Sequence, residues 1–530
     1  MKRHAILIVI IALAAPLFAA DIALDHGLGA LHYAVTTKNA EAQKYFDQGM
    51  RYVYAFNHEQ AIASFQKATA LDPNLALGYW GAALALGPNI NMDVDPEREK
   101  QAFEAEKAAQ AHASNASAKE QDLITALARR YSDDPGADLK KLAVNYSRAM
   151  KEVAAKYPKD DDIATLYAES LMDLHPWKFW SHDGKPNEGT DEIVSVLEGV
   201  LKRNPNHIGA NHYYIHAVEA SPNPGRALSS ANRLKTLAPS AGHLVHMPAH
   251  IYQRTGNYAG AAAANAAGAK ADRAFMSKYG AESMYAGMYY NHNLDFGAAS
   301  YAMIGDFKNA KEVADEVSSN AVKMTAMMPM IEAASVDSLK VLLRFGRWND
   351  IINGKFDTPG PMSTALLHFA RGVAFAQLGN IAGAESEAKA FGDARTKVAD
   401  ETGLFQNSQQ KIVDVASEVL NGRLAAARGD RAGAIAAYRK AVASEDALDY
   451  DEPADWFYPT RESLGAALLR DGQYAAAEKV FREDLARNKN NPRSLYGLSR
   501  ALRGQKKDAT STTAQFTKLW RGGAIRIEDL

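Results

Sequence analysis

A repeat of about 34 residues is the feature of this chain that most limits how it can fold. The first copy, residues 42–75, places small, aromatic and proline residues in a fixed order: Gly49, Tyr52, Ala61, Phe65, Ala68 and Pro73. Small residues let two antiparallel helices approach closely, aromatic rings fill the space between them, and proline ends the second helix. One such unit cannot bury its apolar face alone, so the units must stack side by side.

The same order of residues recurs along the chain. A glycine marks the turn between two helices at Gly256, Gly305, Gly346, Gly379, Gly429 and Gly472. An alanine follows most of these glycines after five residues, at Ala261, Ala310, Ala384, Ala434 and Ala477. The alternation of apolar and polar residues that is typical of strands is absent from the sequence. We therefore predict an all-α solenoid of about 11–12 antiparallel helix pairs. The sequence does not decide whether this solenoid is superhelical or partly closed.

The six positions that agree over residues 42–75 resemble the tetratricopeptide-repeat (TPR) family. The whole chain resembles large exported bacterial TPR proteins of uncharacterised function. This resemblance implies a concave groove, lined by the first helix of each unit, that holds a peptide, a protein or a small-molecule ligand. The fold alone does not name the ligand, so function must be inferred from the side chains of a site.

The N-terminus has the pattern of an export signal. A short basic stretch at residues 2–4 precedes an apolar run and small residues that end near Ala20. This arrangement is typical of a cleaved signal peptide, with an uncleaved membrane anchor as the alternative. We expect a periplasmic or secreted protein with no membrane span in its mature form.

Composition excludes several classes of function. The chain has no cysteine, which excludes disulfides, thiolate metal sites and a lipoprotein anchor. Its 60 basic and 62 acidic residues give a net charge of −2, which disfavours nucleic acid as a partner. We expect the chain to divide into a signal peptide at residues 1–20, an N-terminal segment at 21–41, N-terminal TPR-like repeats at 42–160, central repeats with a histidine-rich groove at 161–304, and C-terminal TPR repeats at 305–524.

Six of the 15 histidines fall within one short stretch of the chain: His207, His212, His216, His243, His246 and His250. His212 and His216 are four residues apart, so they share one face of a helix. His246 and His250 have the same spacing, and each follows its counterpart in the first pair by one full repeat length. Equivalent positions of neighbouring units face the same way, and packed helices lie about 8–10 Å apart. The two pairs are therefore expected to converge.

Imidazoles with carboxylates are ligands that suit Zn, Fe, Cu, Ni or Mn. We predict a divalent metal site built from His212, His216, Glu219, His243, His246 and His250. These ligands could hold one ion with four or five ligands, or two ions that share a carboxylate. Further residues are expected to line the groove beside this site: Glu169, Tyr213, Arg254, His292 and Asp295, with Trp177 and Tyr289 as candidate aromatic walls. His207 follows Pro205 at a helix start and is interpreted as a turn or cap residue.

Two functions stay open at this point. The first is an exported binding or scaffold protein whose groove carries the metal and a ligand. The second is a metal-dependent hydrolase or oxidase/oxygenase, in which Glu219 or Glu169 is the candidate general base. Histidines that contact a partner without a metal, and hydrogen-bonded core histidines, are the alternatives to a metal site. A catalytic site keeps an open coordination position, whereas a structural site is saturated.

An acidic and aromatic stretch, residues 449–459, separates two clean repeats. It could cap the groove or close the solenoid, but we favour a solvated linker with Trp456 packed on the next helix.

Overall fold

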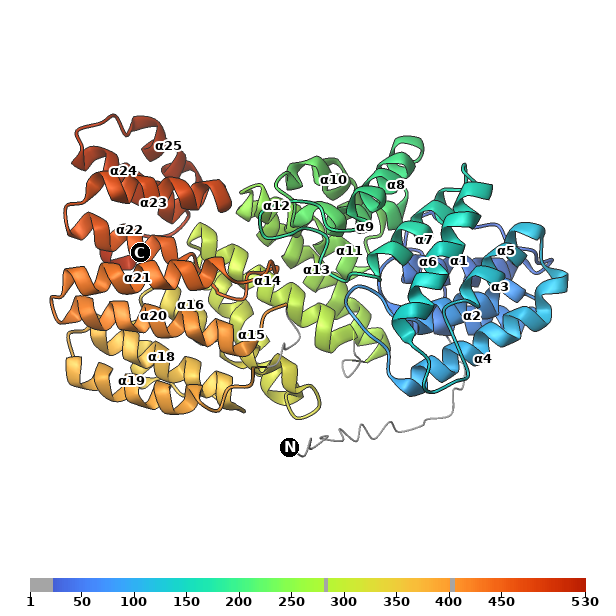
Figure 1. Cartoon of the computed structure of the whole chain (residues 1–530), viewed down its shortest axis with the longest axis horizontal. Helices are drawn as coiled ribbons and strands as arrows, with labels where there is room; N and C mark the ends of the chain where they lie inside the picture. The colour runs from blue at the N-terminus through green and yellow to red at the C-terminus, as the bar shows by residue number, and fades with distance from the viewer. Residues whose placement is uncertain (1–21, 281–284, 401–405) are drawn as a thin grey trace. The chain divides into compact units, whose positions relative to one another are not determined.

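The computed structural model describes residues 22–280, 285–400 and 406–530, which form two compact units (Figure 1). Unit 1 holds described residues 22–26 and 31–156, and unit 2 holds residues 27–30 together with the described residues from 157 to 530. The signal peptide expected at residues 1–20 lies outside the described residues.

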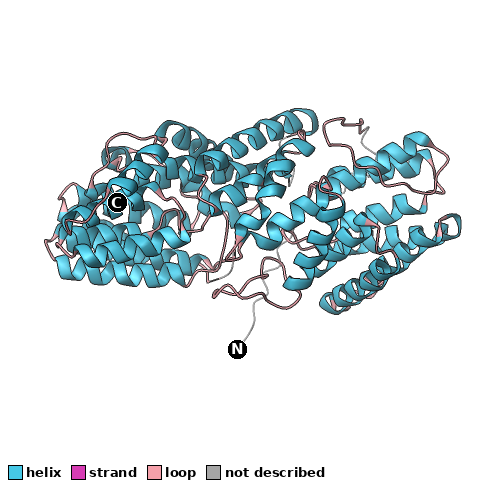
Figure 2. Cartoon of the chain, turned by 90° about the horizontal axis from the view of Figure 1, so that it is seen from above, coloured by secondary structure: helices cyan, strands magenta, loops and turns pink. Residues whose placement is uncertain are grey.

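Helices make up the regular structure of both units (Figure 2). Over the described ranges no strand occurs, and β-pairing is confined to isolated bridges at Asn89–Met92 and Trp180–Pro186. The all-α helical-hairpin fold expected from the repeat is therefore confirmed. Within the same ranges no helix is both long and apolar enough to cross a bilayer.

Unit 1 begins with the hairpin expected from the first repeat copy. Its helices are α1 (Ala40–Val53), α2 (His58–Leu71), α3 (Ala76–Leu86), α4 (Pro96–His112), α5 (Ala118–Leu127) and α6 (Leu139–Lys156), with a 3-10 turn at Ala113–Asn115. Asn39 caps α1, because its side chain accepts from the amides of Glu41 and Ala42. Phe65 is fully buried and lies so close to Gly49 that a β-carbon there would come within 2.5 Å of its ring. The glycine thus permits the close helix approach that the repeat requires.

Unit 2 is also built from helix pairs. Its helices are α7 (Asp161–Met172), α8 (Thr190–Arg203), α9 (Ile208–Glu219), α10 (Leu228–Leu237), α11 (Gly242–His246), α12 (Pro248–Arg254), α13 (Tyr258–Tyr279), α14 (Asn291–Ile304), α15 (Phe307–Met324), α16 (Asp337–Arg344), α17 (Trp348–Asn353), α18 (Pro361–Gln377), α19 (Ile381–Arg395), α20 (Gln409–Ala427), α21 (Arg431–Asp446), α22 (Thr460–Arg470), α23 (Tyr474–Arg487), α24 (Pro492–Gly504) and α25 (Thr510–Leu519). Short 3-10 segments lie at Pro224–Ala227, Pro329–Val336 and Ile527–Asp529, and a π-helical turn lies at Ala286–Tyr290.

The C-terminal helices of unit 2 contact its central helices. The hydroxyl of Tyr258, in the first turn of α13, donates to the carbonyl of Lys489 over 2.9 Å. The amide of Arg521 donates to the carbonyl of Ile304, at the end of α14, over 2.8 Å. Both contacts join segments that are far apart in the sequence, so the array within unit 2 is partly closed.

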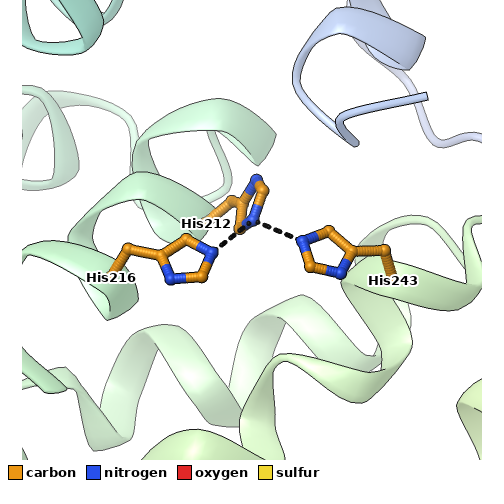
Figure 3. A group of neighbouring side chains, drawn as sticks. All are labelled: His212, His216 and His243. Carbon is orange, nitrogen blue, oxygen red and sulfur yellow. Dashed lines mark hydrogen bonds between the residues drawn. The ribbon is translucent and has the colours of Figure 1, made fainter. Parts of the chain in front are cut away.

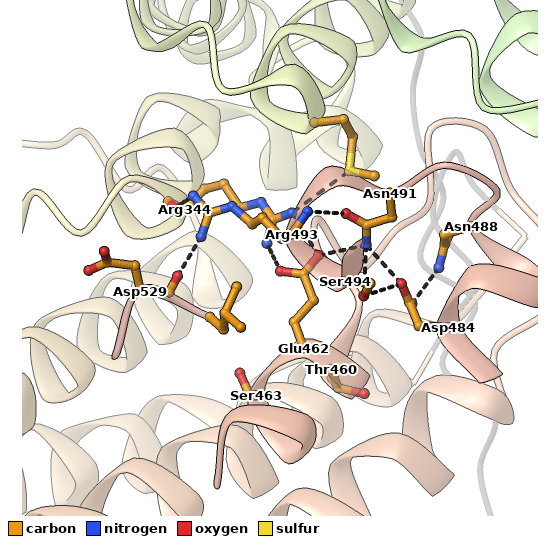
Figure 4. Close-up of polar contacts among 12 residues, drawn as sticks. Arg344, Thr460, Glu462, Ser463, Asp484, Asn488, Asn491, Arg493, Ser494 and Asp529 are labelled. Carbon is orange, nitrogen blue, oxygen red and sulfur yellow. Dashed lines mark hydrogen bonds and ion pairs between the residues drawn. The ribbon is translucent and has the colours of Figure 1, made fainter. Parts of the chain in front are cut away.

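A buried ion-pair network joins α16 to α22 and α24 within unit 2 (Figure 4). Arg344 of α16 forms a two-point ion pair with Glu462 of α22, one of whose hydrogen bonds measures 2.9 Å. Asn491 also donates to Glu462, and Arg493 of α24 donates to the backbone carbonyl of Arg344. All four residues are buried. Because α22 directly follows residues 449–459, the network also anchors that segment.

Candidate metal centre

Four helices of unit 2 carry the clustered histidines: α9, α11, α12 and α14. His212 and His216 lie on α9, and both are buried along with the rest of that helix. Met247 separates the next two helices, so His246 ends α11 and His250 lies in α12.

His207 has a separate role at the start of α9. Its ring nitrogen accepts from the amide of Ala210 over 3.0 Å, which caps the helix. The cap role expected for His207 is therefore observed.

Three imidazoles form what we call the first triad: His212, His216 and His243 (Figure 3). The Nε2 atom of His212 lies 3.1 Å from Nε2 of His216 and 3.1 Å from Nε2 of His243. The three side chains come from two successive histidine helices, and their exposed fractions are 0–3%. The Nε2 atoms therefore point toward one another in the protein interior.

Three further imidazoles form the second triad: His246, His250 and His292. The Nε2 atoms of His246 and His250 are 2.9 Å apart. The ring of His292, on α14, lies 4.9 Å from the ring of His246 between centroids. The sequence placed His292 along the groove, whereas the structure places it with this pair.

Both triads have the same construction. Each combines a pair of histidines, four residues apart, with the second residue of the next histidine helix. His243 is the second residue of α11, and His292 is the second residue of α14. The two triads therefore use equivalent positions of their histidine helices.

Glu219, the last residue of α9, lies between the triads. Its Oε1 accepts from Nδ1 of His216 over 2.9 Å, and its Oε2 accepts from Nδ1 of His250 over 2.5 Å. Its side chain is fully buried. Both carboxylate oxygens contact Nδ1 atoms, on the side of each ring that faces away from its triad. Glu219 therefore lies outside the groups of Nε2 atoms, whereas the sequence analysis expected it among the metal ligands.

Burial sets the electrostatics of the imidazoles. It holds the pKa of His243 and of His246 well below the ordinary histidine value, and neighbouring imidazoles lower both pKa values further. Burial also lowers the pKa of His292 to about 3, and it lowers the pKa of His216 although Glu219 opposes this shift. These four rings are therefore neutral at neutral pH, which is the form that binds metal.

Glu219 is the charged group of the cluster. Burial would raise its pKa, but His250 and His216 outweigh burial and lower this pKa to about 2. Burial would likewise lower the pKa of His250, but the charge of Glu219 and its hydrogen bond raise it above the ordinary value. His250 thus binds a proton more readily than an ordinary histidine, and a metal ion at its Nε2 would displace that proton.

Residues 449–459 pack against α12 beside the cluster, so the solvated-linker interpretation was wrong. The guanidinium of Arg254 lies over the ring of Tyr450, 5.2 Å from its centroid, and its Nε donates to the carbonyl of Glu219. Glu452 is buried and accepts from the hydroxyl of Tyr450 over 3.0 Å. Arg254 thus ties this segment to the end of α9.

Trp456 holds the other end of the same segment. It is buried, and its ring centroid lies 5.7 Å from that of Phe369 on α18. The sequence placed this tryptophan on the helix that follows it, whereas this ring contact is with a helix that precedes it.

Comparison with known proteins gives one family match. Residues 42–75 match the family described as tetratricopeptide repeat. The chain therefore contains a tetratricopeptide repeat (TPR) in its first helix pair, α1 and α2. No curated protein matches its sequence.

Solved structures similar to this chain share little sequence with it. Human IFIT1, as a dimer with m7Gppp-AAAA, is 12% identical with a TM-score of 0.34, and 91% of each chain is covered. Yeast Tom70 is 10% identical with a TM-score of 0.30, and the match covers 88% of this chain and 90% of Tom70. The Cut9–Hcn1 hetero-tetramer of the APC/C gives 12% identity and a TM-score of 0.30, covering 90% of this chain and 73% of the matched chain.

The remaining groove residues expected from the sequence lie around the triads. Glu169 on α7 and Tyr213 on α9 are buried, so neither lines an open groove. Asp295, one turn beyond His292 on α14, instead lines a cavity of about 50 Å³ together with Lys340. Burial and a neighbouring aspartate raise the pKa of Asp295 well above its ordinary value.

Sequence reasoning missed one polar neighbour of the triads, Asn265, but it did name Trp177 and Tyr289 as candidate aromatic walls. The side chain of Asn265, on α13, accepts from Nδ1 of His246 over 2.6 Å. Trp177 and Tyr289 contact the first triad through the rings of its histidines. The second position of each histidine helix is the one sequence signal that could have joined His292 to its triad.

The spacing of the nitrogens suits a metal ion. Zn–N bonds of about 2.0–2.1 Å in a tetrahedral site place ligand nitrogens about 3.3 Å apart. The Nε2 atoms of the triads approach to 2.9–3.1 Å. Three nitrogens from each triad would leave a fourth coordination position for water or a ligand.

Proposed function

We propose that this protein is an exported TPR scaffold whose two triads bind two divalent metal ions, one ion in each. Zn, Cu, Ni, Fe and Mn are the candidate metals, because neutral imidazoles suit this group. The triads link α9, α11, α12 and α14, so the metal would hold successive repeats in register for a peptide or protein partner.

One observation carries this proposal: the hydrogen bonds of Glu219 select which nitrogen of two rings can bind metal. A carboxylate only accepts, so His216 and His250 both donate to it from Nδ1. In their neutral form both rings then carry a lone pair on Nε2, directed into their own triad. Lone pairs held close to other ring nitrogens, away from water, favour a cation between them.

The alternatives to a metal explain less of this arrangement. Nε2 of His212 faces two other Nε2 atoms, and one ring nitrogen cannot complete hydrogen bonds to both with a single proton or a single lone pair. Contact with a partner's carboxylate requires exposed imidazoles, whereas His212 and His246 are fully buried. A metal ion satisfies three lone pairs at once.

Metal analysis of three variants beside the wild type tests the proposal. The wild-type protein is expected to hold two ions per chain after loading with Zn²⁺. His212→Ala/His216→Ala and His246→Ala/His250→Ala are each expected to hold one ion, and the fourfold variant none. No ion in the loaded wild type, or an unchanged count in the fourfold variant, would refute the proposal.

A matched control separates the triads from other histidines. His32→Ala/His368→Ala removes two histidines that pair with a carboxylate outside the triads, Asp47 and Glu387. Two ions should remain in this control. A count that falls here would mean that the measured ions are held elsewhere.

A second candidate, a metal-dependent hydrolase or oxidase, is favoured by the coordination number. Three histidines leave an open position at which a metal-bound water would have a lowered pKa. Co²⁺-loaded protein offers a direct test, because azide changes the visible spectrum of cobalt only if it reaches an exchangeable position. A spectral change on adding azide supports an enzyme. An unchanged spectrum contradicts the enzyme and leaves the scaffold as the remaining proposal.

A further inference from the structure

Glu219 contacts a histidine of each triad, and this double contact has a consequence for how the metal ions load. We propose that Glu219 couples the two triads, so that an ion in one strengthens binding of an ion in the other. This inference rests on the proposed metal function and assigns Glu219 as a positioning residue that acts through His216 and His250.

The geometry holds the carboxylate in one place. Glu219 ends α9, and Arg254 donates to its backbone carbonyl over 3.0 Å. Its two oxygens are used separately, one by His216 of the first triad and one by His250 of the second. A shift of the carboxylate therefore moves a ligand in both triads.

Each contact orients a metal ligand. A hydrogen bond from Nδ1 to a carboxylate fixes the tautomer and the ring orientation of a metal-binding histidine, and its loss typically costs about 10–100-fold in metal affinity. When an ion binds the first triad it orders His216, and His216 in turn orders Glu219. The carboxylate then already holds His250 in the orientation that the second ion needs.

Charge acts in the same direction. Two divalent ions in neighbouring sites repel each other, and a negative group placed between them reduces this repulsion. Glu219 lies between the triads and is fully buried, where charges interact strongly. Its carboxylate would thus favour the doubly loaded state.

Glutamine separates this role from simple packing. Glu219→Gln keeps the size of the side chain, but its amide has one accepting oxygen and one donating nitrogen. The amide can accept from His216 or from His250, and not from both. One triad should therefore lose its anchor while the fold is kept.

Zn²⁺ titration of metal-free protein against a chelating competitor tests the coupling through a double-mutant cycle. His243→Ala empties the first triad without removing a contact of Glu219. This variant should weaken Zn²⁺ binding to the second triad in the native background, and should leave it unchanged in the Glu219→Gln background. Glu219→Gln alone should lower the affinity of at least one site by about 10–100-fold. Glu120→Gln is the matched control, because Glu120 is a buried carboxylate of unit 1 that accepts from the amides of Thr36 and Ser117.

The outcomes separate the two proposals. A wild-type protein that binds no Zn²⁺ overturns the metal function and the coupling with it. Two ions that bind Glu219→Gln as tightly as the wild type overturn the coupling alone. The same follows if His243→Ala weakens the second site equally in both backgrounds. Circular dichroism and thermal melts of the metal-free variants establish that each is folded.

Discussion

Glu106 shows how a single buried carboxylate can set the pH response of unit 1. It lies on α4 with 2% of its surface exposed, and burial raises its pKa to about 8. A carboxyl whose pKa is higher in the folded than in the unfolded state favours folding below the unfolded pKa of about 4.3. That contribution is lost as the pH rises through 8.

We expect Glu106→Gln to remove this pH dependence. Between pH 5 and pH 9, the wild-type helix should lose local stability on the order of 3–5 kcal/mol, whereas the variant should lose little. Hydrogen exchange of the α4 amides at pH 5 and pH 9, corrected for the intrinsic exchange rate, measures the difference. Glu104→Gln, on the exposed face of the same helix, is the control and should follow the wild type. Equal protection changes in all three proteins would contradict the prediction.

At the scale of helices, the close contact of Gly49 with Phe65 decides how the first hairpin packs. A β-carbon at position 49 would lie 2.5 Å from the Phe65 ring, so Gly49→Ala forces the ring to move. Overpacking of this kind costs about 1–3 kcal/mol, and adding Phe65→Leu should recover part of the loss. Urea denaturation compares the variants, and a neutral Gly49→Ala would show that the ring moves freely.

Gly392 on α19 is the opposite case. A β-carbon at this position meets nothing within 4 Å, so Gly392→Ala creates no clash. Alanine has the higher helix propensity, and the variant should stabilise α19 by about 0.5–1 kcal/mol. Urea denaturation again measures the change, and a loss of stability would contradict the prediction.

The helix scale also shows what the sequence could predict. The repeat indicated the helix pairs and brought His212 and His216 into register with His246 and His250, since an offset of one repeat preserves the facing direction. The sequence did not indicate that His292 joins the second triad, because the interval from His250 to His292 is longer than the interval from His216 to His243 in the first triad. The sequence therefore indicated most of the triad residues and left one or two ions open, but it did not assign the histidines to two sets.

The packing of residues 449–459 against α12 could not be predicted from the sequence for another reason. Their contact with Arg254 joins segments that lie far apart in the sequence. The local composition of a segment cannot predict a contact of this kind. The acidic residues of the segment suggested solvent, whereas Glu452 is buried in the fold. Only the closure of the array in unit 2 brings the two segments together.

At the scale of the whole molecule, the triads connect α9, α11, α12 and α14 of unit 2, and no residue of either triad belongs to unit 1. A ligand that binds only the folded state adds about 2.7 kcal/mol per site at a concentration about 100 times its Kd. We expect Zn²⁺ to slow hydrogen exchange in α9, α11, α12 and α14, and a chelator to reverse this effect. Exchange in α1–α3 should not respond. Protection that rises equally in both units would indicate non-specific binding, against the proposed sites.

The common construction of the triads has a further meaning for how such a protein changes over generations. A site made from a histidine pair and the second residue of the next histidine helix is a modular element, and copying one repeat unit copies most of its ligands. Metal capacity can then grow by tandem duplication of repeats, without the invention of a new pocket. In such a lineage the number of metal ions per chain would rise with the number of histidine-bearing repeats.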